Sequence, residues 1–247
     1  REYLEHVAQH VAGPLFVTGH SKGGNLATFA ATTCADGVRA RIERCYSHDG
    51  PGFFEEIVTD PRWMANTNMV ERIVPEESLV GMLLSNGGTE PLVVCSTNPG
   101  VMQHSPFSWV VEGDDFAYAH SITYDSYRTG KRMNSWLASM APTDRERVVE
   151  ILYKLVQATG ETTTSGLLSS LSDGSLELML RRLDGLPESE RTFFLRAMGD
   201  LAATMLLGPA PTNPQTPTER VTDAVNRIED ATAKFNDRMS RWEKYLS

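Results

Sequence analysis

The sequence predicts an α/β fold in which a parallel sheet is followed by a helical module. An apolar run at 15–17 enters a glycine-rich turn and then a helix of small residues, which gives the order strand, turn, helix. Further apolar runs lie at 41–48, 69–74 and 91–96, and turn-forming or charged residues follow them, as expected for buried parallel strands. Beyond about residue 133 only helical periodicity remains.

The glycine-rich turn, GHSKGG at 19–24, matches the G-x-S-x-G pattern of a nucleophile elbow. Such an elbow presents its serine, here Ser21, at the tip of a strained turn. Gly19 and Gly23 would then remove the Cβ atoms where strand and helix crowd together. Ser21 also precedes a helix N-terminus, whose free N–H groups favour an oxyanion. The backbone N–H of Lys22 is the first candidate donor.

Two other interpretations of this turn were considered. A phosphate-binding loop is excluded because the spacing G-x-x-x-x-G-K-[ST] is absent. A glycine-rich turn without chemistry is the plain alternative, but the preceding strand, the following helix and the adjacent His20 favour the elbow. We therefore expect Ser21 to be a nucleophile.

Three motifs together resemble an uncharacterised bacterial family of lipase-like α/β-hydrolases: GHSKGGNLA at 19–27, DGPGF at 49–53 and QHSPFSW at 103–109. The matching motifs lie between Leu15 and Trp109. The resemblance implies an α/β-hydrolase fold with a parallel sheet and a serine nucleophile, and it implies no particular substrate.

The chain reaches its elbow unusually early for this fold. Only a helix at 1–13 precedes it, with Tyr3, Leu4, Val7 and Val11 on one face. We expect N-terminal strands to be missing, so that the chain is the C-terminal part of a longer protein, because the elbow strand would otherwise leave an unpaired edge. A fold cut down to a few strands is the alternative.

Composition limits the classes of partner. The chain has 247 residues, 40% of them hydrophobic, and a net charge of −9, which argues against nucleic acid or an anionic membrane as the main partner. Cys34, Cys45 and Cys95 have neither metal-ligand spacing nor the density of a disulfide scaffold. No run approaches the ~20 apolar residues of a membrane span, and no signal-peptide layout opens the sequence. We expect a cytoplasmic protein without metal or cofactor.

Candidate partners for Ser21 follow the later strands. Asp49 ends the strand at 41–48, at the edge where functional groups of open α/β sheets gather, and is the first candidate acid. Glu77 follows the strand at 69–74 and is the alternative acid. His104 lies after the strand at 91–96, the usual place of the base in a chain ordered serine, acid, histidine.

Two more histidines and one apolar run are further candidates for the site. His120 is the second candidate base, and His20 is expected to line the site. The apolar run at 78–84 lies near the same edge, so Leu79 and Met82 are candidate substrate-binding residues. Ordinary core packing is the alternative for that run. Between the strands we expect helix and loop at 53–68 with a break at Pro61, and a last edge strand at 107–111.

The predicted domains are a hydrolase core at 1–132, a helical module at 133–208, a proline-rich linker at 209–218 and a heptad-patterned helix at 219–247. The module is expected to begin a helix with a capping box at Thr143 and to contain further helices, at 165–171, 175–183 and 187–207, the last ended by Gly208. It would dock on the core or form a lid. The final helix would self-associate, bind a protein partner, or pack on its own domain.

The sequence therefore predicts a lipase-like serine esterase that transfers an acyl group from an ester or related substrate to water through Ser21, His104 and Asp49. A chain lacking the loop before the elbow would lack one oxyanion donor, and losing a donor costs about 10²–10³ in rate. The alternative function is a non-catalytic binding or scaffold module that associates through its C-terminal helix.

Overall fold

The computed structural model describes residues 1–157, 183 and 185–208. The chain divides into two compact units, residues 1–134 and 135–247. The predicted linker at 209–218, the heptad helix at 219–247 and the helix at 165–171 lie outside the described residues, as does the helix at 175–183 apart from Leu183.

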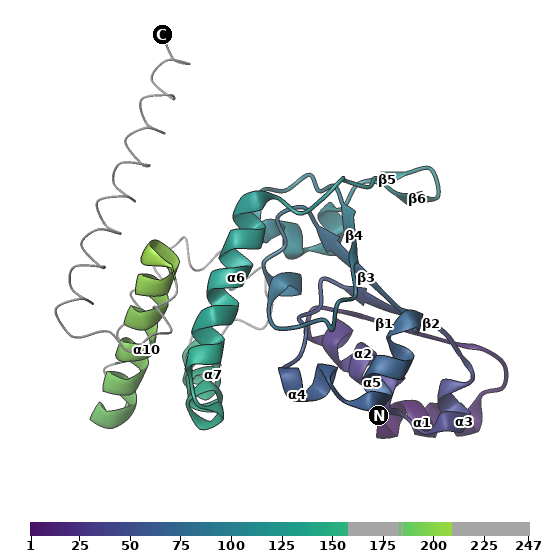
Figure 1. The fold of residues 1–247 in the computed structure, drawn as a ribbon, viewed down its shortest axis with the longest axis horizontal. Coiled ribbons are helices and arrows are strands. Elements are labelled where there is room, and N and C mark those ends of the chain that lie inside the picture. Colours follow the sequence, from purple (N-terminus) through teal and green to yellow (C-terminus); the bar gives the residue numbers. More distant parts are fainter. Residues whose placement is uncertain (158–182, 184, 209–247) are drawn as a thin grey trace, which may run out of the picture. The chain divides into compact units, whose positions relative to one another are not determined.

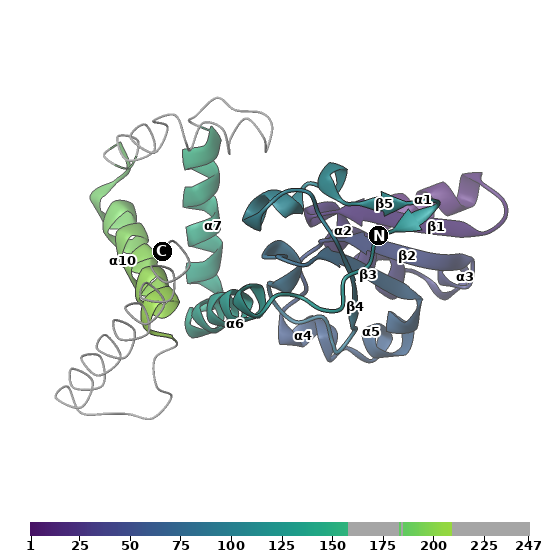
Figure 2. The same cartoon turned by 90° about the horizontal axis from the view of Figure 1, so that it is seen from above.

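A four-stranded parallel sheet in the order β1-β2-β3-β4 forms the centre of the first unit (Figure 1). The strands are β1 Leu15–His20, β2 Ile42–His48, β3 Val70–Pro75 and β4 Pro91–Val94. The predicted α/β class with a parallel sheet is therefore confirmed. Figure 2 shows β1, β2 and β3 side by side, and their parallel register places the C-terminal ends of the strands at one edge of the sheet.

Helix α2, Lys22–Thr33, packs against β1 and β2. Its buried face consists of small residues, and Ala27, Ala31 and Cys34 meet Ile42 and Cys45 in one hydrophobic cluster. Small side chains let the helix approach the strands closely, which the elbow between β1 and α2 requires. Burial raises the pKa of the Cys45 thiol to about 11, so this cysteine stays a neutral core residue at neutral pH.

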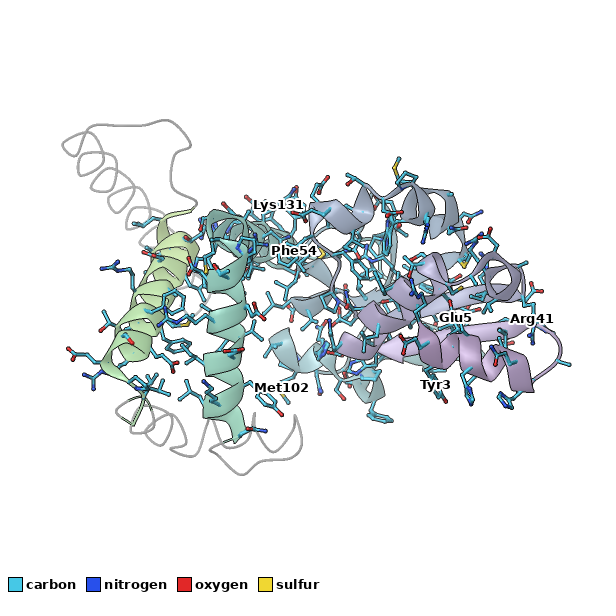
Figure 3. The ribbon with its side chains drawn as sticks, turned by 90° about the horizontal axis from the view of Figure 1, so that it is seen from below. Tyr3, Glu5, Arg41, Phe54, Met102 and Lys131 are labelled. Atoms are coloured by element: carbon cyan, nitrogen blue, oxygen red, sulfur yellow. The ribbon has the colours of Figure 1, made fainter. Side chains whose placement is uncertain are left out.

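Helix α1, Glu2–His10, buries part of the predicted face, where Leu4 and Val7 are half-buried, and that face extends to Ala8. Ala8 is its buried residue and Leu4 packs on the α2 cluster, whereas Tyr3 is 81% exposed and Val11 is 45% exposed. Figure 3 shows Tyr3 pointing away from the helix. Val11 leaves the stripe because it has extended backbone angles, φ −121° and ψ 143°, and so lies beyond the helix end.

Arg41 fixes the path from α1 into β1. Its guanidinium donates to the backbone carbonyls of Ala8 and Val11, both at 2.6 Å, and to that of Gly13 at 3.0 Å (Figure 3). These three bonds satisfy carbonyls at the end of the helix and in the following turn, which have no partner within the helix itself.

The prediction of an edge strand at 107–111 is wrong. The chain instead forms two 3₁₀ turns, Gly100–His104 and Pro106–Ser108, and then a short hairpin of β5 Val111–Glu112 and β6 Asp115–Phe116. Pro106 has no N–H to donate, and the Ser108 hydroxyl bonds the carbonyl of Ser105 at 2.7 Å. Of the expected pairing with the sheet, an isolated bridge between Ser96 and Trp109 forms.

Three short helices lie in the connections before and after β2. They are α3 Asp36–Arg39, α4 Glu55–Val58 and α5 Pro61–Asn66. Pro61 begins α5, where a missing N–H costs nothing, and Asp60 caps that helix by accepting the N–H of Arg62 at 2.7 Å. The predicted break at Pro61 is therefore a helix start.

The second unit contains the end of α6 Tyr124–Ser139, with α7 Pro142–Gln157 and α10 Glu188–Leu207. Its described core is a cluster of Trp136, Val148, Ile151, Leu155, Leu183, Phe194 and Ala197. The capping box at Thr143 does not form, because Pro142 is already helical and Thr143 lies inside the first turn. Helix α10 ends at Gly208, with φ 86°, as the sequence predicts. None of the described helices has both the length and the apolar character needed to cross a membrane.

Candidate active site

Ser21 forms a sharp turn between β1 and α2. Its backbone angles are φ 56° and ψ −128°, a conformation that side-chain-bearing residues rarely adopt. The Ser21 N–H donates to the carbonyl of His48 at 2.9 Å, which ties the turn to the end of β2. Strain of this kind persists only where the surrounding structure enforces it, and here it holds the serine at the end of the strand.

Close backbone contact around the turn requires two of the glycines. A Cβ atom on Gly19 would overlap the backbone of Gly23, and one on Gly24 would lie 2.7 Å from Ser47 Oγ. Gly23 itself faces open space, so the expectation that Gly19 and Gly23 both relieve crowding is wrong for Gly23. The crowded position is instead Gly24, where α2 passes over the end of β2.

Lys22 occupies the first position of α2, so its N–H has no carbonyl of an earlier helical turn to bind. Its amino group donates to Asn25 Oδ1, one turn further along the helix, at 2.8 Å. The buried Asn25 amide donates to the carbonyls of Pro51 at 3.1 Å and Gly52 at 2.9 Å. Asn25 thus holds the loop that follows Asp49 onto α2. Its only signal in the sequence is a polar residue on the small-residue face of the helix.

Asp49 lies at the end of β2 and is fully buried, with 0% exposure. It has φ 47°, and its N–H donates to the carbonyl of Ile73 at 2.8 Å. The carboxylate receives three donors: His104 Nδ1 on Oδ2 at 2.6 Å, the Gly81 N–H on Oδ1 at 3.0 Å, and the Ser78 hydroxyl on Oδ1. The structure therefore brings two of the three candidate residues, Asp49 and His104, into direct contact.

His104 ends the 3₁₀ turn Gly100–His104, and its side chain is 17% exposed. A carboxylate accepts the hydrogen bond, so Nδ1 carries the proton and Nε2 is left as the acceptor. His20 Nε2 donates to the His104 carbonyl at 2.8 Å, and the two ring centroids lie 4.6 Å apart. His20 therefore supports the backbone of the turn that carries His104.

Glu77 supports the same turn from the other side. Its carboxylate accepts the N–H of Gly100 and the Gln103 amide at 3.2 Å, while Gln103 Oε1 accepts the Glu77 N–H at 2.9 Å. Gln103 is buried. The alternative acid is thus bound to the residues beside His104, whereas the imidazole itself is bound to Asp49.

The family described as Mbeg1-like matches residues 1–154. The chain belongs to the Mbeg1-like family. Neither a curated protein nor a solved structure matches it. The matched region contains the whole candidate site of this Mbeg1-like chain and ends within α7.

Three further residues of this Mbeg1-like protein were selected from the sequence: Leu79, Met82 and His120. Leu79 and Met82 are half-buried, and the Met82 carbonyl accepts the Asn134 amide of α6 at 2.9 Å. His120 is exposed and follows Ala119, whose N–H donates to the carbonyl of Val93 at 2.8 Å.

Burial lowers the pKa of His48, and the neighbouring His20 acts in the same direction, so His48 is neutral at pH 7.

The described residues of the Mbeg1-like chain offer no group of three His, Cys, Asp or Glu side chains that could hold a metal ion. Within the same residues no hydrogen bond joins the Ser21 hydroxyl to His104. Catalytic hydrogen bonds often tighten only when substrate binds, so the missing bond does not exclude Ser21 and His104 as a nucleophile and its base.

Substitution of Gly19 tests the crowding at the turn. Gly19→Ala should lower the free energy of unfolding by about 3 kcal/mol, because the new methyl group overlaps backbone that cannot move aside. Gly23→Ala is the matched control and should change it by less than about 1 kcal/mol, since its methyl group enters open space on a helix. Urea denaturation measures both, and equal losses would contradict the crowding at Gly19.

Substitution of Asn25 tests the contact between α2 and the loop after Asp49. Asn25→Asp replaces a buried donor facing two carbonyls with a group that only accepts, and should cost about 2–3 kcal/mol of unfolding free energy. Lys22→Met removes only the exposed amino group from the other side of the amide and should cost less than about 1 kcal/mol. If thermal unfolding finds the two variants equally stable, the amide does not hold the loop.

Proposed function

We propose that this protein is a serine hydrolase of the α/β-hydrolase type, lipase-like, which transfers an acyl group from an ester to water. The observation that carries the proposal is the 2.6 Å bond between a fully buried Asp49 and His104, at the same sheet edge as the strained turn of Ser21. A buried acid that fixes the tautomer of an imidazole is what a serine nucleophile needs from its neighbours.

The reaction uses each of these groups once in each half. Ser21 Oγ bonds to the acyl carbon while its proton moves to His104 Nε2, and the ester C–O bond breaks as the alcohol takes that proton. Water then attacks the acyl-enzyme, gives its proton to Nε2, and releases the acid as the proton returns to Ser21. Asp49 holds the imidazole and stabilises its charged form, and the Lys22 N–H binds the oxyanion.

An apolar acyl group suits the surroundings. The half-buried Leu79 and Met82 belong to the segment that carries the Gly81 donor to Asp49. On the turns that flank His104, Met102 is 42% exposed and Phe107 is 98% exposed. Apolar side chains exposed beside a reactive centre favour apolar ligands, so a lipid ester or another ester with a hydrocarbon acyl chain is the proposed substrate class.

Covalent labelling tests the nucleophile without knowledge of the substrate. A fluorophosphonate probe should modify the full chain at Ser21, located by mass spectrometry of the labelled peptide, because an activated serine displaces fluoride from phosphorus. Ser21→Ala should abolish labelling. Ser105→Ala, which removes a half-buried serine beside His104, should leave it intact. Labelling that survives in Ser21→Ala would refute the assignment of the nucleophile.

A second comparison separates the two carboxylates. Asp49→Asn should lower the labelling rate by about 10⁴, since an amide at this place no longer selects the reactive tautomer. Glu77→Gln keeps a carbonyl oxygen for the Gly100 N–H and should cost less than about 10-fold, whereas Glu77→Ala releases the turn and should cost about 10². The reverse ranking of Asp49→Asn and Glu77→Gln would make Glu77 the acid.

A further inference from the structure

Arg72 is a buried cation that the proposed reaction does not use directly. It lies on β3 and is 7% exposed, between Ser47 on β2 and Pro91 on β4 in the sheet register. A buried guanidinium is costly unless its hydrogen bonds and its charge are both compensated. Its hydrogen bonds go to two backbone carbonyls, Gly81 at 2.8 Å and Thr89 at 2.7 Å.

These contacts connect Arg72 to the carboxylate of Asp49 through one residue. Gly81 gives its carbonyl to Arg72 and its N–H to Asp49 Oδ1. A Cβ atom on Gly81 would lie 2.5 Å from Asp49 Oδ1, so only glycine lets the backbone come this close. The Ser78 hydroxyl, in the same segment, also binds Oδ1, and the Ser78 carbonyl accepts the Ser126 hydroxyl of α6.

The charges complement each other as well. Burial lowers the pKa of Arg72 to about 10, and the negative charges of Asp49 and then Glu90 oppose that change, so the guanidinium stays cationic at neutral pH. Asp49 receives no direct ion pair from a lysine or arginine among the described residues. Arg72, which is connected to Asp49 through Gly81, therefore supplies a positive charge that compensates this buried carboxylate.

We propose that Arg72 is a positioning residue of the active site, which pins the Gly81 segment against Asp49 and serves as the counter-charge of that carboxylate. This inference rests on the proposed function. The proposed reaction would then also require a buried cation connected to Asp49, on a strand, β3, that carries none of the reacting groups.

The charge of the Asp49–His104 pair determines whether loss of Arg72 raises or lowers the pH at which the pair is protonated. The pair carries one negative charge when the imidazole is neutral and none after it takes a proton, wherever that proton sits. A nearby cation favours the negative state, so removing it raises the pH at which the pair becomes protonated. Of the other charged groups nearby, His20 lies against the His104 ring, Glu77 binds the turn of His104, and Glu90 acts on Arg72.

The test compares charge-removing and charge-keeping variants of the full chain. The fluorophosphonate labelling rate of Ser21 is measured against pH, and the imidazole NMR signal of His104, assigned by its loss in His104→Asn, is titrated in parallel. Arg72→Met and Arg72→Gln should shift two quantities up by about 0.5–1 pH unit: the acid limb of the plot of labelling rate against pH, and the midpoint of the His104 NMR titration. They should also lower the plateau rate about 10-fold or more.

Arg72→Lys should keep the acid limb within about 0.2 unit but lower the plateau, because one ammonium does not reproduce the fork that reaches two carbonyls. Arg44→Met, at an exposed arginine of β2, is the control for net charge and should change neither. A lowered plateau with an unmoved limb in Arg72→Met and Arg72→Gln would overturn the counter-charge role.

Different measurements test the role of Arg72 and the proposed hydrolase activity. A wild-type protein that is not labelled at Ser21 would refute the hydrolase, and the NMR midpoint would then still decide whether Arg72 acts on the pair. If neither neutral variant folds, Arg72→Lys decides alone, and an unchanged plateau in that variant would overturn the pinning of the Gly81 segment.

Discussion

The buried carboxylate of Asp49 is the constraint on which the first unit depends. A fully desolvated carboxylate costs several kcal/mol unless donors replace its water. Its three donors come from separate parts of the chain: the segment after β3 supplies Ser78 and Gly81, and the 3₁₀ turn after β4 supplies His104. The ends of β2, β3 and β4 must therefore meet at one edge, and the parallel register of the sheet ensures that they do.

The glycines obey the same requirement for close approach. Gly19 and Gly24 allow α2 to cross the ends of β1 and β2, and Gly81 allows the backbone to reach Asp49. Side chains at these positions would push apart the elements whose contact defines the site. Gly23, which completes the recognisable pattern, has no steric role of this kind, so a residue that marks a motif in sequence need not be the one that the packing requires.

The sequence predicted what local patterns encode. The strand, turn and helix around Ser21 and the end of β2 at Asp49 follow from runs of apolar residues and turn formers, and all are present. Asn25, Ser78 and Arg72 were missed because their roles depend on partners far along the chain. The strand expected at 107–111 does not form, because Pro106 has no N–H to donate and the Ser108 hydroxyl bonds the nearby carbonyl of Ser105. A prediction from the number of apolar residues does not take these local effects into account.

The choice between Asp49 and Glu77 could not be made from sequence, since both follow neighbouring parallel strands and reach the same edge. The environments of the two carboxylates separate them. Glu77 is half-buried and bound by two neutral donors of the His104 turn, whereas Asp49 is fully buried and bound by the imidazole itself. Two carboxylates on one imidazole would repel each other, and engaging Glu77 with the turn leaves a single negative charge at His104. Glu77 thereby holds the turn that places His104 against Asp49.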